Sequence, residues 1–302
     1  MNVFAGIDGG QSSTVAVIGD EGGRILGRGA AGPADEIGAG RDSTRLHDAL
    51  HGALEDAQRN ARLPGASRFS AIVAGISGYD GQAYGRAPEL PSARVRLVHD
   101  TPIAHAGALG GRAGVVVIAG TGSVVYGRND VGWSCTLGGW GFLFGDEGSA
   151  LRIARDALAK LMRAHDEGDS SLDAETRAVC DFFGTPSLRR LAHGFYKGEV
   201  TRDRLAAFAP AALRFDVFRS AANRGADRLA VLTATAIAAG APARVALVGG
   251  VFSDAGLRER VRAGILQRFP DAEIVDARYD PVYGALLLAY RELGLNVTEL
   301  QR

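Results

Sequence analysis

The stretch NVFAGIDGGQSSTVAVIGD, residues 2–20, decides the fold of this chain. Its first half predicts a short strand that ends in a tight glycine turn, and its second half predicts a strand that runs back beside the first. The segment EGGRILGRGAAG (21–32) then adds a turn and a third strand. We therefore expect an antiparallel meander at the start of the chain.

The same order of elements returns later in the chain. Each meander is followed by apolar residues at helical spacing and then by further strands. This duplicated strand–strand–strand–helix–strand pattern predicts two related α/β lobes that face each other across a cleft. We place the N-terminal lobe at 1–105 and the C-terminal lobe at 106–302, with a closing helix at about 281–294 that packs back on the N-terminal lobe. The second meander consists of AGVVVIAGTG (113–122), SVVYGRND (123–130) and GWSCTLGGWG (132–141).

Composition excludes several classes of protein. The 302 residues suggest two domains, and 34 basic side chains balance 34 acidic ones, so we expect no nucleic-acid partner. No apolar run reaches the roughly 18 residues of a membrane span, and the N-terminus does not resemble a signal peptide. Cys135 and Cys180 are too few and too distant for a disulfide framework. We expect a cytoplasmic protein without a membrane partner, and a homodimer stays open.

Two glycine turns are candidate phosphate sites. Glycine lets backbone N–H groups approach an anion closely, and neighbouring hydroxyls add donors. Asp8, at the tip of the first strand, is placed to hold Mg²⁺. A plain hairpin turn explains the same residues structurally. The candidate phosphate-binding residues are Gly9, Gly10, Gln11, Ser12 and Ser13 in the first turn, and Gly120, Thr121, Gly122 and Ser123 in the second.

Other candidates lie where predicted strands end. Asp100 follows VRLVH, where a carboxylate could act as general base for a hydroxyl; the alternative is an N-cap for a helix that starts at Pro102. The pair Gly249–Gly250 would let a flat ring or a ribose lie on the backbone, or would only permit close packing. In GDEGS, Asp146 has the alternative role of N-cap for a helix over 146–168.

These motifs, in this order, resemble the BadF/BadG/BcrA/BcrD ATPase family. The resemblance runs from residue 3 to about residue 290, and GGWG with GDEGSA resembles the amino-sugar kinase branch in particular. It implies an α/β fold of two actin-like (ribonuclease H-like) lobes and an ATP-dependent kinase that phosphorylates a hydroxyl of N-acetylglucosamine or glucosamine. The motifs are DGGQSST, HD, GTGS, GGWG, GDEGSA, LVGGVFSD and DPVYGALLLA.

The resemblance also implies a role for each candidate. Asp100 would be the catalytic base, Asp8 would organise Mg²⁺, and the two glycine turns would hold the phosphates of ATP. Gly249, Gly250 and Phe252 would border the adenosine. The sugar would contact Asp35, Ser77, Gly78, Asp100, Thr121, Gly139, Trp140 and Asp146.

Two departures from the family pattern bear on the substrate and the base. The family often has Asn where this chain has Asp35, and often Asn where it has His99, which either orients Asp100 or has no role. An alternative function is the ATPase activator of a 2-hydroxyacyl-CoA dehydratase or benzoyl-CoA reductase. Such an activator holds an iron–sulfur cluster through cysteines, and Cys135 and Cys180 are not on the glycine-flanked loops that this would require.

Overall fold

The computed structural model describes residues 2–36, 40–65 and 67–301. The chain forms two compact units: unit 1 is Met1–Val116 with Asp276–Arg302, and unit 2 is Val117–Val275. The lobe limits 1–105 and 106–302 stay a prediction. The final helix lies in unit 1, where it packs on the first sheet.

Unit 1 is built on a five-stranded sheet with the order β3-β2-β1-β4-β5. The first three strands form the expected antiparallel meander, and β4 and β5 run parallel to β1. The predicted hairpin thus forms where the glycine turn was expected. The strands are β1 (Val3–Gly9), β2 (Thr14–Asp20), β3 (Ile25–Ala31), β4 (Ala71–Ile76) and β5 (Val95–His99).

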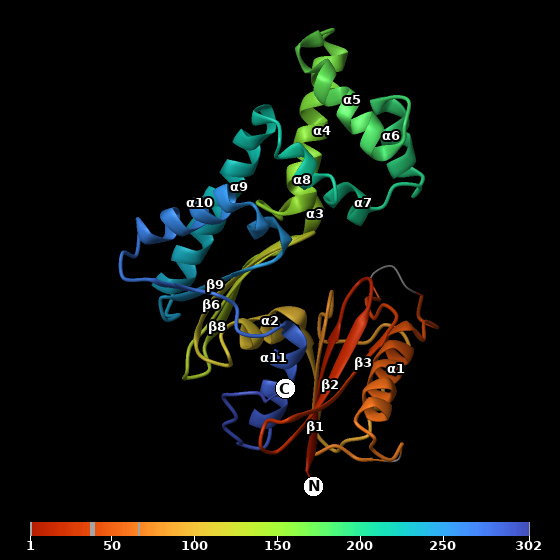
Figure 1. Cartoon of the computed structure of the whole chain (residues 1–302), viewed down its shortest axis with the longest axis vertical. Coiled ribbons are helices and arrows are strands. Elements are labelled where there is room, and N and C mark those ends of the chain that lie inside the picture. Colours follow the sequence, from red (N-terminus) through yellow and green to blue (C-terminus); the bar gives the residue numbers. More distant parts are fainter. Residues whose placement is uncertain (1, 37–39, 66, 302) are drawn as a thin grey trace. The chain divides into compact units, whose positions relative to one another are not determined.

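Helices cover both faces of this sheet (Figure 1). On one face lies α1 (Arg45–Asn60), and on the other lie α2 (Asp100–Ala108) and α11 (Pro281–Arg291). Successive side chains of a strand point to opposite faces. Phe4 therefore packs under α11, whereas Ala5 and Ile7 pack under α1.

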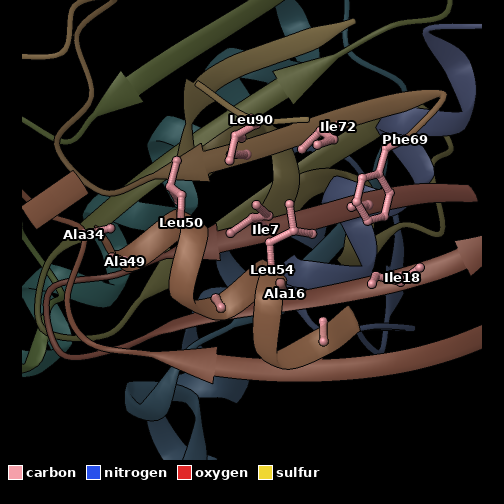
Figure 2. Close-up of a cluster of buried hydrophobic side chains, with 14 of the residues drawn as sticks. Ile7, Ala16, Ile18, Ala34, Ala49, Leu50, Leu54, Phe69, Ile72 and Leu90 are labelled. Atoms are coloured by element: carbon pink, nitrogen blue, oxygen red, sulfur yellow. The ribbon is translucent and has the colours of Figure 1, made fainter. Parts of the chain in front are cut away.

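The core beneath α1 is mainly aliphatic. Leu50 and Leu54 point from the helix onto the sheet beside Ile7 and Ile72 (Figure 2). Each of these four side chains is at most 2% exposed, and full burial of such a side chain is worth about 1.5–3 kcal/mol. This core fixes the end of β1, where Asp8 stands.

Glycine at two positions lets α11 touch α2 and β1 backbone to backbone. A Cβ on Gly284 of α11 would overlap the carbonyl oxygen of Ile103 and the amide of Gly107. A Cβ on Gly6 of β1 would overlap the backbone of Leu286. The first residue of α2, Asp100, is thus held on a helix that is packed tightly against its neighbour.

Unit 2 contains the second sheet, with the order β10-β9-β6-β7-β8. Read from β8, this is the order of the first sheet, so the predicted architectural duplication and the α/β class are confirmed. As in the first sheet, the last two meander strands are antiparallel and the last pair is parallel. The strands are β6 (Gly114–Ala119), β7 (Ser123–Arg128), β8 (Ser134–Gly138), β9 (Arg244–Val248) and β10 (Glu273–Val275).

The rest of unit 2 is helical, as expected for its middle part. A hydrophobic cluster around Leu161, Phe208 and Phe218 joins several of these helices, which Figure 1 shows in green and teal. The α-helices are α3 (Gly141–Phe144), α4 (Ala150–Asp166), α5 (Asp173–Phe183), α6 (Leu188–Tyr196), α7 (Arg202–Ala206), α8 (Ala209–Ala212), α9 (Asp216–Ala238) and α10 (Ala255–Leu266). Short 3-10 helices are η1 (Ser170–Leu172) and η2 (Gly250–Ser253).

Candidate functional site

The first glycine turn is a tight hairpin loop at the end of β1. The amide of Gly10 donates to the carbonyl oxygen of Ser13 at 2.9 Å, and the side chains of Gln11, Ser12 and Ser13 are exposed. The hairpin interpretation is therefore confirmed. It does not compete with phosphate binding, because the exposed loop still offers hydroxyl groups.

This loop is joined to two segments predicted to touch the sugar. The amide of Ser77 donates to the carbonyl oxygen of Gly9 at 2.8 Å, and the amide of Ala34 donates to that of Gly10 at 3.0 Å. Asp35 directly follows Ala34. The structure thus brings the first glycine turn, Asp35 and Ser77 together within unit 1.

Three carboxylates interact electrostatically near the same strand end. Burial, together with the negative charges of Asp100 and Asp280, raises the pKa of Asp8 from 3.8 to about 6. Asp280 was not predicted. It directly precedes Pro281, and among the described residues its side chain makes no capping bond to α11. Asp is a preferred N-cap residue, but within the described chain the Asp280 carboxylate makes no such bond to α11. Its negative charge instead raises the pKa of Asp8.

Asp100 is the first residue of α2, one residue after β5 ends. The expected helix start at Pro102 and the N-cap alternative for Asp100 are both wrong, because the N-cap is His99. The Asp100 carboxylate is 38% exposed and lies 2.7 Å from Nδ1 of His99. It is therefore accessible to a ligand and close to a potential donor.

Glu36 is a site residue that the sequence did not reveal. Only 7% exposed, it accepts the amides of Tyr84 at 2.9 Å and Gly85 at 3.4 Å on Oε2. Its Oε1 has no hydrogen-bond partner among the described residues. Glu36 lines a small cavity together with Ser77 and Gly78. A second buried acid thus stands beside Asp35, which is 6% exposed.

In unit 2 the second glycine turn contacts Asp146. The Asp146 carboxylate accepts the backbone N–H of Ser123, and a Cβ on Gly122 would lie 3.1 Å from its Oδ2. The turn is fastened to the start of α4 because the amide of Ala150 donates to the carbonyl oxygen of Gly120 at 2.8 Å. Hydrogen bonds thus join the GTGS and GDEGS motifs directly.

The expected helix over 146–168 begins later than predicted. Its N-cap is Ser149, whose hydroxyl accepts the amide of Arg152 at 3.1 Å. Asp146 lies before it in a left-handed turn with φ 59°, so its N-cap alternative is wrong. Burial raises the pKa of this carboxyl, which is 8% exposed.

The glycine pair after β9 lies directly against the end of β6. Gly249 has φ 109°, and a Cβ there would overlap the carbonyl oxygen of Ala119. Beside it is a cavity of about 620 Å³ whose lining includes Gly120, Thr121 and Gly250. Its helical wall is mainly apolar and consists of Ala150, Ile153, Asp203, Ala206, Ala207, Ala209, Pro210 and Leu213.

Two residues differ from expectation around this cavity. Phe252 is only 6% exposed and is absent from the lining that the described residues form, whereas Val251 and Ser253 belong to it. Asp203 was missed, although Thr121 Oγ1 donates to its Oδ1 at 3.4 Å. No local signal identifies Asp203, because it lies far along the chain in a helical region.

The GGWG segment presents an exposed aromatic ring. Trp140 is 75% exposed and follows Gly139, whose φ is 69°. Leu143 and Phe144 of α3 are also exposed, at 66% and 84%. Three apolar side chains on one short helix and its N-cap form a surface on which the face of a sugar ring can stack.

The family model named BadF/BadG/BcrA/BcrD ATPase matches residues 5–289. The chain belongs to this family. Its members use ATP, and the two glycine turns and the cavity beside Gly249 lie within the matched residues. Within the described part of the chain, no helix is long and apolar enough to cross a membrane.

Proteins similar to this chain are named as sugar kinases. An N-acetylmuramic acid/N-acetylglucosamine kinase of Clostridium acetobutylicum is 29% identical over 66% of this chain and 68% of its own length. An N-acetyl-D-glucosamine kinase of Dictyostelium discoideum is 25% identical over 95% and 97%. A solved structure from Chromobacterium violaceum, provisionally named an N-acetylglucosamine kinase, has TM-score 0.78 and 28% identity over 96% and 99%.

Proposed function

We propose that this protein transfers the γ-phosphoryl group of ATP to a hydroxyl of an amino sugar, with Asp100 as the general base. The protein is an enzyme of the ATP-dependent sugar kinase class, as its relatives are. The observation that carries the finer proposal is the convergence in unit 1. There the glycine turn is bonded to Ser77 and adjoins Asp35, while Asp8 and Asp100 interact at the same strand end.

The proposed reaction assigns a task to each carboxylate. The sugar hydroxyl gives its proton to Asp100, its oxygen forms a bond to the γ-phosphorus, and the bond to the bridging oxygen of ADP breaks. A proton acceptor of this kind contributes about 10²–10⁴-fold to a rate. Asp100 is accessible enough for this task, with 38% of its side chain exposed.

The two glycine turns would hold the phosphates, and the cavity beside Gly249–Gly250 would hold the nucleoside. Its volume of about 620 Å³ lies within the usual range of about 300–1,000 Å³ for small-molecule pockets. Its alanine-rich wall suits the flat face of a purine. Gly139, Trp140 and Asp146 would then contribute the sugar side of unit 2.

Mg²⁺ fits the residues near Asp8. Among the described residues, no cluster of three or more ligand side chains could hold a metal alone. Mg²⁺ beside nucleotides is usually held by one or two carboxylates, water and the phosphates. Asp8, whose pKa is raised by burial and by two like charges, would gain from a nearby cation. Bound Mg²⁺ would supply neutralisation of phosphate charge.

The activator alternative finds no support in the two cysteines. Cys135 lies within β8 and Cys180 within α5, so neither stands on a loop. Burial raises the pKa of both thiols, which disfavours the thiolates that a cluster needs. Protein purified without oxygen should be colourless, and the absorption of an iron–sulfur cluster would favour the activator instead.

A coupled ADP-release assay tests the proposed activity. Glucosamine, N-acetylglucosamine, N-acetylmuramic acid and glucose are each added with ATP and Mg²⁺, and ATP hydrolysis without sugar is the baseline. At least one amino sugar should raise ADP release and yield a sugar phosphate by mass spectrometry. If no sugar exceeds the baseline, the proposed kinase function is wrong.

A further inference from the structure

The junction between β5 and α2 places a histidine against the proposed base. β5 ends at His99, whose backbone is extended at φ −60° and ψ 156°, and α2 begins at Asp100. The two side chains meet although they are neighbours in sequence: His99 Nδ1 lies 2.7 Å from Asp100 Oδ1. In the parallel register His99 pairs with Ile76, the residue before Ser77.

The same ring nitrogen has a second partner. Nδ1 lies 3.3 Å from the amide nitrogen of Thr101 and 3.1 Å from its Oγ1. The amide can only donate, and a carboxylate can only accept. A single nitrogen cannot donate to Asp100 and accept from the Thr101 amide at once. The two hydrogen bonds therefore exclude each other.

The protonation of Nδ1 decides between these two bonds. With a proton on Nδ1, the ring donates to Asp100, and at 2.7 Å this is the short distance of a charge-assisted bond. Without that proton, the Nδ1 lone pair faces a carboxylate, and the ring is left with its bond from the Thr101 amide.

We propose that His99 is a positioning residue that donates from Nδ1 to Asp100 Oδ1 and leaves Oδ2 to take the proton of the sugar hydroxyl. This inference rests on the proposed function, in which Asp100 is the base. When Nδ1 loses its proton, His99 acts only as the N-cap of α2 and the Asp100 carboxylate is no longer held.

The surrounding charges favour the held state. The hydrogen bond to Asp100 raises the pKa of His99 above its usual 6.5, burial opposes this, and the negative charge of Asp100 adds to the rise. Across the site, Asp8 on β1 interacts with Asp100 and with Asp280 before α11. A cationic imidazole in contact with Asp100 therefore offsets part of the repulsion between Asp100 and Asp8.

The sign of the pH effect follows from the raised pKa. The protonated form persists above the usual value and is lost as pH rises through the folded-state pKa. A neutral ring can keep its remaining proton on Nδ1 and still donate to Asp100, but the bond then lacks the positive charge that strengthens it. The kcat of the wild-type enzyme should therefore fall on the alkaline side of that value, by less than it falls in His99→Ala. A change of residue 99 to one that does not titrate should remove this limb of the profile.

Three variants separate positioning from capping. Asn in His99→Asn can cap α2 and can donate to Asp100 at every pH. Asp in His99→Asp caps equally well but cannot donate, and Ala in His99→Ala does neither and adds no charge. We measure kcat, the KM of sugar and of ATP, thermal stability, and kcat from about pH 6 to about pH 9 around the ordinary histidine pKa.

If His99 positions Asp100, His99→Asn keeps kcat and loses the alkaline limb. His99→Ala and His99→Asp then lower kcat by about tenfold or more while both KM values change little. If capping alone matters, His99→Asp matches His99→Asn in kcat and stability, and the inference is overturned. It is also overturned if His99→Ala has the wild-type kcat and pH profile.

A spectroscopic titration gives a readout that does not depend on activity. The imidazole signal that disappears in His99→Asn belongs to His99, and its pKa is followed by NMR in the wild type and in Asp100→Asn. We expect this pKa to fall in Asp100→Asn, and an unchanged value contradicts the bond. Retained turnover in Asp100→Asn would instead show that the base assignment is wrong.

Discussion

The carboxylate of Asp146 accepts the backbone N–H of Ser123, so a buried acid from the GGWG–GDEGS region closes the second glycine turn. The same residue has a left-handed backbone with φ 59°. This conformation costs an ordinary L-residue roughly 1–2 kcal/mol, and Asn and Asp tolerate it best among side chains. Asp146 thus has two roles: its carboxylate binds the glycine turn, and its backbone adopts the left-handed conformation that this segment requires.

Asp146 variants should separate these two contributions. Asp146→Asn keeps a residue that tolerates the backbone, so its free energy of unfolding should exceed that of Asp146→Ala by about 1 kcal/mol or more. Asp146→Gly accepts the conformation but loses the bond to Ser123. Denaturant unfolding of the three variants measures this, and equal stability of the Ala and Asn variants would contradict the conformational argument.

The close contact of Gly249 with Ala119 predicts that adding a methyl group at residue 249 lowers both stability and ATP affinity. Gly249→Ala forces a Cβ onto the Ala119 carbonyl, and its φ is positive, so we expect a lower melting temperature and an ATP dissociation constant raised by about tenfold or more. Calorimetric titration and thermal unfolding measure both.

Gly250→Ala is the matched control for stability. Among the described residues nothing lies within 4 Å of a Cβ at Gly250, so its melting temperature should stay near that of the wild type. A similar loss of stability in both variants would show that the contact with Ala119 is not the cause.

The raised pKa of Asp8 predicts that the free energy of unfolding depends on pH. Its folded-state pKa, about 6, lies above the ordinary 3.8, so between these values the folded state binds more protons than the unfolded state. The free energy of unfolding contributed by this group therefore falls as pH rises through that window. Asp8→Asn should gain stability relative to wild type from about pH 4 to about pH 7, measured by thermal unfolding in EDTA.

Asp271→Asn, at an exposed position in unit 2, is the control for the substitution itself. A difference between Asp8→Asn and wild type that stays constant with pH would contradict the raised pKa. In the kinase assay, Asp8→Asn should also shift the midpoint of Mg²⁺ activation upward, and an unchanged midpoint would remove Asp8 from the surroundings of the metal.

The sequence was most informative where the determinants are local. The first hairpin could be predicted because its turn glycines stand between two short apolar runs. The start of α2 was placed two residues late because His99, an uncommon N-cap, caps the helix through its ring. Asp146 was expected in a helix because GDEGS contains no visible sign of the left-handed turn.

Long-range partners could not be predicted from one sequence. Asp280 acts on Asp8 only because α11 packs against β1 and α2. Glu36 depends on the loop amides of Tyr84 and Gly85, and Asp203 on its contact with Thr121. These pairs are separated by about fifty residues or more, and no spacing rule links them.

Asp35 predicts a preference for glucosamine over N-acetylglucosamine and glucose. A carboxylate only accepts hydrogen bonds and carries charge, and Asp35 is 6% exposed, so an ammonium on the ligand suits it better than an acetamide. Asp35→Asn should weaken glucosamine selectively by about 1.5–3 kcal/mol of transition-state binding.

The kcat/KM values for the three sugars test this preference. Glu36→Gln is the matched comparison, because Glu36 holds loop amides and its loss should affect the three sugars alike. Equal losses for all sugars in Asp35→Asn would mean that Asp35 reads hydroxyls only. No loss for any sugar would place Asp35 outside the sugar site.

The central claim is that Asp100 takes the proton of the sugar hydroxyl during phosphoryl transfer. The most direct measurement is single-turnover formation of the sugar phosphate by wild type and Asp100→Asn at saturating ATP and sugar, with Asp271→Asn as control. The substitution keeps size and removes proton acceptance, so the rate of transfer should fall by about 10²–10⁴-fold with binding of both ligands retained. A transfer rate within about threefold of wild type, well below the effect of losing a general base, would contradict the account.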